Sequence, residues 1–137
     1  MITNRIVLLA SLQNATGNNI TAERIANFLR CSTTTVELVD VHSFEDNQSF
    51  RNWSEKKIKD TTLFVGVHAY RAGKLLLGSC IPYIIIFGGT DINENYKDDK
   101  KLAIMKHACK EAKLLICFTS TIKDRALQVK YLIYVIV

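Results

Sequence analysis

Short runs of apolar residues without polar alternation recur along this sequence, and segments with helical periodicity separate them. Strands that are buried on both faces have this composition, and such strands belong to parallel sheets covered by helices. Regular alternation of strands and helices produces right-handed crossovers and a doubly wound sheet. The sequence therefore predicts a single Rossmann-like α/β domain with a mostly parallel sheet of about six strands. We expect these strands at residues 5–10, 35–41, 63–67, 82–87, 114–118 and 131–137.

Between these runs, apolar residues spaced at i, i+3, i+4 and i+7 predict helices. The clearest helices are expected at residues 21–31, 99–112 and 120–127, and a shorter one is expected after residue 67. One amphipathic turn or helix is expected around Phe50 and Trp53. The segment GGTDINENYKDD at residues 88–99 is interpreted as a loop.

The bulk composition restricts the class of protein. A chain of 137 residues is the size of one domain and can bury a substantial core. Hydrophobic residues make up 48% of the chain and charged residues 23%, which is typical of a globular protein. The net charge of +5 suits an anionic small ligand. A nucleic-acid-binding protein usually clusters its basic residues beside aromatics, whereas these lysines spread over two helical stretches, so no nucleic-acid partner is expected.

The four cysteines, Cys31, Cys80, Cys109 and Cys117, lie far apart in the sequence. A zinc site needs closely spaced pairs, so we expect no metal. The apolar runs are shorter than the ~20 residues of a transmembrane helix, and the N-terminal run is shorter than the ~7–15 residues of a signal-peptide core. These features predict a soluble, cytoplasmic protein without a transmembrane segment. Two of the four Asn-x-Ser/Thr sequons lie in the predicted ligand loop, where a glycan would block the site, which also favours the cytosol; secretion stays open as an alternative.

Ligands of open α/β sheets bind outside the carboxyl ends of the strands, near the point where strand order reverses. The first such loop leads into a helix N-terminus, where Gly17, Asn18 and Asn19 offer backbone N–H groups to a phosphate. The dinucleotide fingerprint GxGxxG is absent, which makes NAD(P) binding a weak alternative. Asp40 ends the second predicted strand as the ribose-binding acid of NAD enzymes does, but an acid that caps the next turn explains it better.

Two further loops contribute candidate residues at the same edge. Gly88 and Gly89 directly follow a predicted buried strand and permit a close approach of the backbone, and Thr90 and Asp91 add a hydroxyl and a carboxylate. A helix-capping turn would explain Asp91 equally well. His68 ends the third predicted strand, where it is either a hydrogen-bonded structural residue or a ligand contact.

Four segments together resemble the N-terminal domain of retaining glycosyltransferases of the family-4 type, which have the GT-B fold. These segments are residues 16–29 (TGNNITAERIANFL), 65–76 (VGVHAYRAGKLL), 82–93 (PYIIIFGGTDIN) and 102–126. The resemblance implies one of two Rossmann-like domains that face each other across a cleft. In such enzymes the N-terminal domain binds the acceptor, and a C-terminal domain holds the nucleotide-sugar through an Arg/Lys pair and an E-x7-E motif.

Carried over to this sequence, the resemblance implies that Gly17, Asn18 and Asn19 face the donor diphosphate. His68 would be the catalytic residue near the transferred sugar. Gly88, Gly89, Thr90 and Asp91 would line the substrate cleft. Transfer would need no metal or other cofactor, and the partners would be a nucleotide-sugar and a glycosyl acceptor.

The resemblance fades after Ala126, and the sequence shows no donor-binding C-terminal domain. We therefore expect residues 1–137 to be the acceptor-side half of a glycosyltransferase, a truncated isoform that is inactive alone. The alternatives are a non-catalytic binding or regulatory Rossmann module and an NAD(P)-binding domain. The uncharged apolar run at residues 131–137, from Tyr131 to Val137, predicts self-association through a C-terminal strand.

Overall fold

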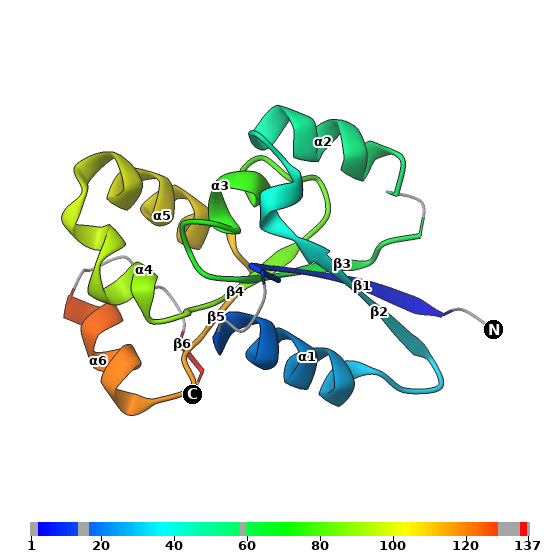
Figure 1. The fold of residues 1–137 in the computed structure, drawn as a ribbon, viewed down its shortest axis with the longest axis horizontal. Coiled ribbons are helices and arrows are strands. Elements are labelled where there is room, and N and C mark those ends of the chain that lie inside the picture. The colour runs from blue at the N-terminus through cyan, green and yellow to red at the C-terminus, as the bar shows by residue number, and fades with distance from the viewer. Residues whose placement is uncertain (1–2, 14–16, 58–59, 129–134, 137) are drawn as a thin grey trace.

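The computed structural model describes residues 3–13, 17–57, 60–128 and 135–136 (Figure 1). Its centre is a six-stranded sheet in the order β2-β1-β3-β4-β5-β6, in which all paired strands are parallel. The predicted α/β fold with a parallel sheet is confirmed. The strands are β1 (Asn4–Ala10), β2 (Thr34–Asp40), β3 (Leu63–Val67), β4 (Tyr83–Ile86), β5 (Leu114–Ile116) and β6 (Val135–Ile136).

Helices cover the two faces of the sheet unequally. Among the described helices, α1 packs alone on one face, where Ala22 and Ala26 belong to the same apolar cluster as Leu8 of β1. The opposite face carries side chains from the helices that follow β2 to β5, including Phe50, Met105 and Ala126 (Figure 1). The helices are α1 (Gly17–Leu29), α2 (Asn47–Glu55), α3 (Gly73–Leu76), α4 (Thr90–Asn93), α5 (Asp99–Glu111) and α6 (Ser120–Gln128), with 3-10 turns η1 (Val41–Ser43) and η2 (Asn95–Lys97).

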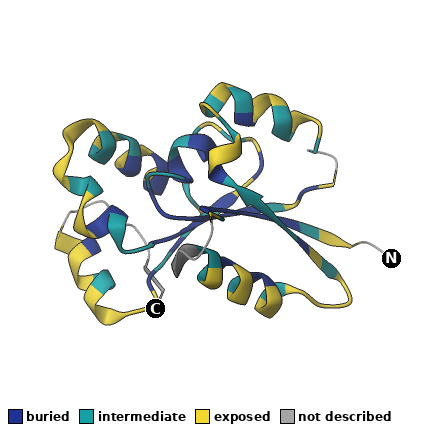
Figure 2. Ribbon diagram, viewed as in Figure 1, coloured by how far each residue is buried: buried dark blue, intermediate teal, exposed yellow. Residues whose placement is uncertain are grey.

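The burial pattern explains why the strand runs lack polar alternation. Val7, Leu8, Leu9 and Ala10 in β1 are all fully buried, because α1 covers one face of the strand and the remaining helices cover the other. Figure 2 shows this central band of buried residues, with exposed residues on the outer sides of the helices, in connecting segments and at strand ends. β1 therefore occupies the middle of the core.

Strand order reverses between β1 and β3. From β1 the chain moves to its neighbour β2 on one side, and it then crosses to β3 on the other side and continues outward to β6. The connections that leave β1 and β3 therefore go to opposite faces of the sheet, which opens a crevice at their carboxyl ends. The candidate residues in the segments that follow β1, β3 and β4 were expected at this crevice.

Several element boundaries differ from the sequence prediction. Helix α1 begins at Gly17 and not at residue 21, so the predicted phosphate loop forms its first turn. The interpretation of residues 88–99 as a loop was wrong, because this segment contains α4 and η2. Of the apolar run at residues 131–137, only Val135 and Ile136 are described as a strand, and they pair with β5 at the sheet edge. The rest of the run lies outside the described residues.

A glycine in β3 lets the following helix lie directly on the sheet. A Cβ atom at Gly66 would stand 2.8 Å from Leu76 Cδ1 and 2.9 Å from Ala72 Cβ, which is closer than real Cβ contacts. Any larger residue at this position would push α3 and its preceding turn away from the strand. Because that turn begins at His68, Gly66 helps to fix the position of His68 at the carboxyl end of β3.

Candidate functional site

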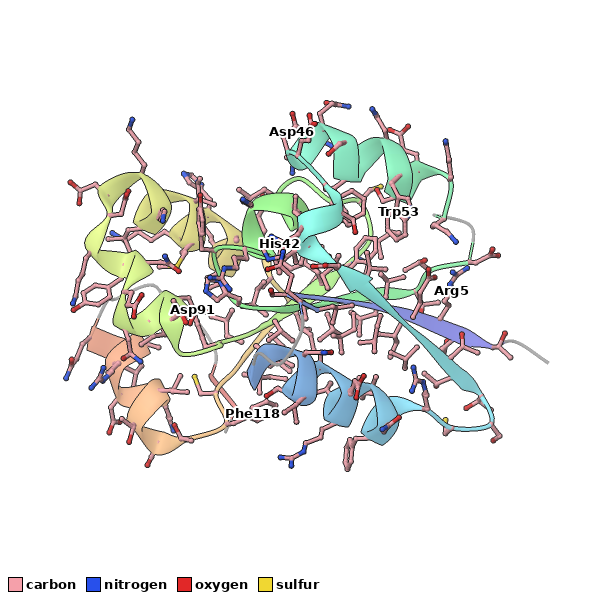
Figure 3. All side chains as sticks on the ribbon, viewed as in Figure 1. Arg5, His42, Asp46, Trp53, Asp91 and Phe118 are labelled. Atoms are coloured by element: carbon pink, nitrogen blue, oxygen red, sulfur yellow. The ribbon has the colours of Figure 1, made fainter. Side chains whose placement is uncertain are left out.

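The carboxyl ends of β1 to β4 bring the predicted loops together at one edge. Ala10 is paired with Asp40, and Val67 with Ile86, so the four strands end nearly level. The His68 N–H donates to Ile86 O at 2.8 Å and extends the pairing of β3 and β4 by one residue. The loops that begin at residues 11, 41, 68 and 88 thus share one edge. Figure 3 shows His42 and Asp91, which follow β2 and β4, on this side of the molecule.

Asp91 is completely buried and ties two of these loops together. Its Oδ2 accepts a hydrogen bond from Ala69 N at 2.7 Å, and its Oδ1 accepts from Gly89 N and Ile92 N at 2.9 Å each. Gly88 N donates to the same carboxylate at 3.1 Å. The structure therefore turns the Asp91 side chain inward, so that it positions the edge without reaching the solvent side.

Gly89, two residues before Asp91, leaves the outside of this edge open. Gly89 has φ +100°, a conformation that favours glycine, and no atom lies within 4 Å of the place where its Cβ would stand. Gly88, Gly89 and Thr90 are half-buried. The backbone and the Thr90 side chain, and not the carboxylate, form the accessible part of the predicted cleft.

His68 lies at the centre of the edge and is 1% exposed. Its φ of 92° is positive, which is rare for a residue with a side chain and signals local strain. Its Nδ1 accepts hydrogen bonds from Arg71 N at 3.0 Å and from Tyr70 N at 3.3 Å. Its Nε2 has no hydrogen-bond partner in the described part of the chain.

The protonation state of His68 follows from this environment. Its pKa is lowered to about 4, mainly because the ring is buried; the Asp91 carboxylate opposes this shift, and the nearby cations Arg71, Lys101 and Lys74 contribute to it. The imidazole is therefore neutral near pH 7. Since Nδ1 accepts two hydrogen bonds, the single ring proton belongs on Nε2, which becomes a buried N–H donor without an acceptor. The ring edge beside it faces Gly88, where a Cβ would stand 3.4 Å from His68 Cδ2.

The low pKa of His68 predicts a specific pH dependence of stability. Between pH 4 and the ordinary value of 6.5, the unfolded chain binds more protons at this residue than the folded chain. Stability should therefore fall as the pH drops through this window, by up to about 3 kcal/mol from His68. We expect urea unfolding at several pH values to show a shallower decline for His68→Asn, because asparagine tolerates positive φ and does not titrate. Parallel curves for the two proteins would contradict the assignment.

The N-terminus of α1 lies beyond the end of β1. Gly17, Asn18 and Asn19 are in its first turn, where backbone N–H groups have no acceptor within the helix. The partial positive charge of the helix dipole favours an anion at this position. The structure thus places the three predicted residues at a helix terminus as expected, although as helical residues and not as a loop.

Ser11 and His42 form a pair that the sequence pattern does not predict. Ser11 Oγ and His42 Nε2 share a hydrogen bond of 3.0 Å across the ends of β1 and β2. Asp40 Oδ1 accepts from His42 N at 3.1 Å and from Leu12 N at 3.3 Å, which confirms its interpretation as an acid that caps the turn after the strand. No local sequence pattern predicts a contact between Ser11 and His42, because they are far apart in the chain. The pairing of β1 with β2 brings them together.

A wide apolar groove of about 560 Å³ lies on the sheet face that α1 covers, between α1 and the strands β4 and β5. It is lined by Ile84, Ile86 and Ile116 from the strands and by Phe28 and Phe118 at its margins. The side chain of Phe28 is 89% exposed and that of Phe118 is 52% exposed. This surface is separate from the polar edge, and Figure 3 shows Phe118 near the end of α1.

Two structural observations bear on metals and membranes. Within the described ranges, no three His, Cys, Asp or Glu side chains are grouped to hold a metal ion, and all four cysteines are free. None of the described helices is long and apolar enough to cross a bilayer.

Comparison with known proteins relates this chain to part of a longer protein. No family model matches the sequence. The chain is 36% identical over 122 residues to Glycosyltransferase 1 domain-containing protein 1 of Xenopus tropicalis. The aligned region covers 89% of this chain and 34% of that protein, so the chain spans about a third of the length of its relative. This similarity agrees with the resemblance derived from the four sequence segments.

Proposed function

We propose that this chain, which is similar to Glycosyltransferase 1 domain-containing protein 1, is the acceptor-side half of a glycosyltransferase. With a donor-binding domain facing the carboxyl edge of its sheet, it takes part in moving a sugar from a nucleotide-sugar to an acceptor. The parallel sheet with its crevice between β1 and β3 supports the proposal, since this is where such folds bind ligands.

The unpartnered Nε2–H of His68 is the observation that carries the proposal. A buried donor without an acceptor costs about 1–3 kcal/mol, and a strained backbone at the same residue adds to this cost. Such a cost is understandable where a ligand oxygen completes the hydrogen bond. We assign His68 to the sugar that is transferred or to the attacking acceptor hydroxyl, with Gly89 and Thr90 forming the adjacent wall.

The first turn of α1 supplies the second part of the proposed site. Backbone N–H groups of Gly17, Asn18 and Asn19 would receive the donor diphosphate, because a helix N-terminus stabilises a phosphate anion. This chain's contribution to leaving-group stabilisation would therefore be made by the backbone. The chemistry needs no metal in this proposal.

The isolated chain is expected to be inactive for physical reasons. Fixing the donor and acceptor against each other can supply about 7–11 kcal/mol of a reaction barrier, and this requires both walls of a cleft. Without the second wall, the N-terminus of α1 would face water, in which electrostatic stabilisation is much weaker.

A transfer assay with a panel of nucleotide-sugars tests this function. We expect no transfer from the 137-residue chain and measurable transfer from a protein extended by a donor-binding domain. Gly17→Trp should abolish transfer by the extended protein, because the indole would occupy the diphosphate position. Ser32→Trp, an exposed position at the opposite end of the sheet, is the matched control and should retain activity. Robust turnover by the isolated chain, or full activity of Gly17→Trp, would overturn the proposal.

The exposed apolar groove favours a second candidate function, a non-catalytic module that binds another protein. Phe28 and Phe118 leave large apolar surfaces in water, which often mark a protein contact. The transfer assay on the extended protein distinguishes the two candidate functions, because a non-catalytic module transfers no sugar either alone or with a donor-binding domain.

A further inference from the structure

Two lysines lie close to the ring of one tyrosine next to the proposed site, and an arginine follows that tyrosine in the chain. Lys74 Nζ lies 5.2 Å from the centre of the Tyr70 ring, and Lys101 Nζ lies 5.3 Å from the same centre. Lys74 belongs to α3 and Lys101 to α5, while Tyr70 and Arg71 are in the turn that leaves β3. We call Tyr70, Arg71, Lys74 and Lys101 the Tyr70 cluster. All four residues are half-buried.

The cations of the Tyr70 cluster are not neutralised by acidic partners. Across the described ranges, the ion pairs join Arg5 to Glu37 and Asp60, and Lys57 to Glu37, and none includes a cation of the cluster. The carboxylate of Asp91 is fully buried and is already bonded to backbone N–H groups. Two ammonium groups near one ring repel each other, so this arrangement leaves a concentrated positive potential at the edge.

The cluster is also joined directly to His68. Tyr70 N and Arg71 N donate the hydrogen bonds that hold His68 Nδ1, so the turn that carries the cluster fixes the imidazole. Arg71, Lys101 and Lys74 all help to lower the pKa of His68, which means that their charges act on that ring. On the other edge of the same ring, the buried Nε2 has no partner in the described part of the chain, so the residue next to the cluster offers a hydrogen-bond donor to a ligand.

We propose that the Tyr70 cluster binds a phosphate group carried by the glycosyl acceptor, and that this contact places an acceptor hydroxyl beside His68. The proposal rests on the proposed function, because it names the class of acceptor for that site. Three cations suit a dianionic phosphate better than a monoanion. The donor diphosphate is not the expected occupant, because it is assigned to the N-terminus of α1, which lies on the other face of the sheet from α3 and α5.

Binding of inorganic phosphate to the 137-residue chain tests the cluster without any assay of transfer. In an NMR titration at low ionic strength, we expect saturable shifts of the Tyr70, Arg71, Lys74 and Lys101 amides, with much weaker effects from acetate. Lys74→Gln combined with Lys101→Gln should weaken phosphate binding at least 10-fold. Lys100→Gln combined with Lys110→Gln removes the same charge from exposed positions of α5 and should change binding less than 2-fold.

The possible outcomes separate this inference from the proposed function. Shifts confined to the first turn of α1, or equal weakening by both double variants, would overturn the phosphate site. Because the titration of the unaltered chain reads the site directly, misfolding of a variant would not prevent a decision. If phosphate binds at the cluster but the extended protein transfers no sugar, the proposed function fails and the anion site stands. If sugar is transferred but phosphate does not bind at the cluster, the function stands and the phosphorylated acceptor is ruled out.

Discussion

Replacing Asp91 with asparagine is expected to lower the free energy of unfolding by about 3 to 5 kcal/mol. The carboxylate accepts hydrogen bonds from the backbone N–H groups of Ala69, Gly88, Gly89 and Ile92 while fully buried. An asparagine side chain keeps one acceptor oxygen but turns an NH₂ group toward at least one of these donors. The result is a buried donor facing a donor, in addition to the loss of charge-assisted bonds.

Urea unfolding monitored by circular dichroism measures this effect. Asp124→Asn is the matched control, since Asp124 is exposed on α6 and its replacement should change stability by less than about 0.5 kcal/mol. Equal stability of the two variants would show that the hydrogen bonds of Asp91 between the loops after β3 and β4 contribute little to the free energy of unfolding. A loss of this size is a large fraction of the total stability of a small domain, which is about 5–15 kcal/mol.

In a protein that also carries a donor-binding domain, His68→Asn is expected to reduce kcat/KM at least about 100-fold. Removing one positioned hydrogen-bond donor from an active site typically costs about 10²–10³ in rate. Asparagine offers an acceptor oxygen near the position of Nδ1, so it can keep the bonds to Tyr70 N and Arg71 N, and it tolerates the positive φ. It has no group at the position of Nε2. The variant therefore removes the proposed ligand contact and leaves the turn intact.

His107→Asn is the matched control for this variant. His107 is exposed on α5, and histidine and asparagine have similar helix propensities, so activity should stay within about 2-fold. Donor binding measured by calorimetry should be similar for His68→Asn and the unaltered protein, because the diphosphate is assigned to α1. Unchanged kcat/KM for His68→Asn would show that His68 has only a structural role.

The strands could be predicted because their signal is local. The run at residues 82–87 became β4 at Tyr83–Ile86, and residues 63–67 became β3 without any change of bounds. In both cases burial on the two faces selects apolar residues at every position, and this is visible without knowing the neighbours. The parallel sheet then follows from the alternation of strands with helices.

The helical segments near the site were harder to predict, because tertiary contacts decide them. Helix α4 begins at Thr90 within a stretch of glycine and polar residues, and the buried bonds of Asp91 hold that stretch in place. Nothing in the local pattern shows that this carboxylate will be turned inward. Helix α1 begins at Gly17, although glycine is a poor helix former and the apolar periodicity starts only at Ala22.

The candidate site was predictable in its location but not in its contacts. The rule that ligands bind at the carboxyl ends of strands brought His68 and Gly88 to one edge, and the structure puts them there. The proton of the neutral His68 ring belongs on Nε2 because two backbone N–H groups donate to Nδ1, and only the folded turn reveals these donors. The two lysines near the Tyr70 ring belong to different helices, so their common position needs the packing of α3 against α5.

The central position of β1 has a consequence for synthesis on the ribosome. The strand ends at Ala10, but its second neighbour, β3, begins only at Leu63. At translation rates of about 5–20 residues per second, one edge of this apolar strand stays unpaired for several seconds. The pairing of β1 with β3 also closes a long loop, which slows folding because chain entropy is lost before the contact forms. The nascent chain is therefore most prone to aggregate in the interval before residue 67 has left the exit tunnel.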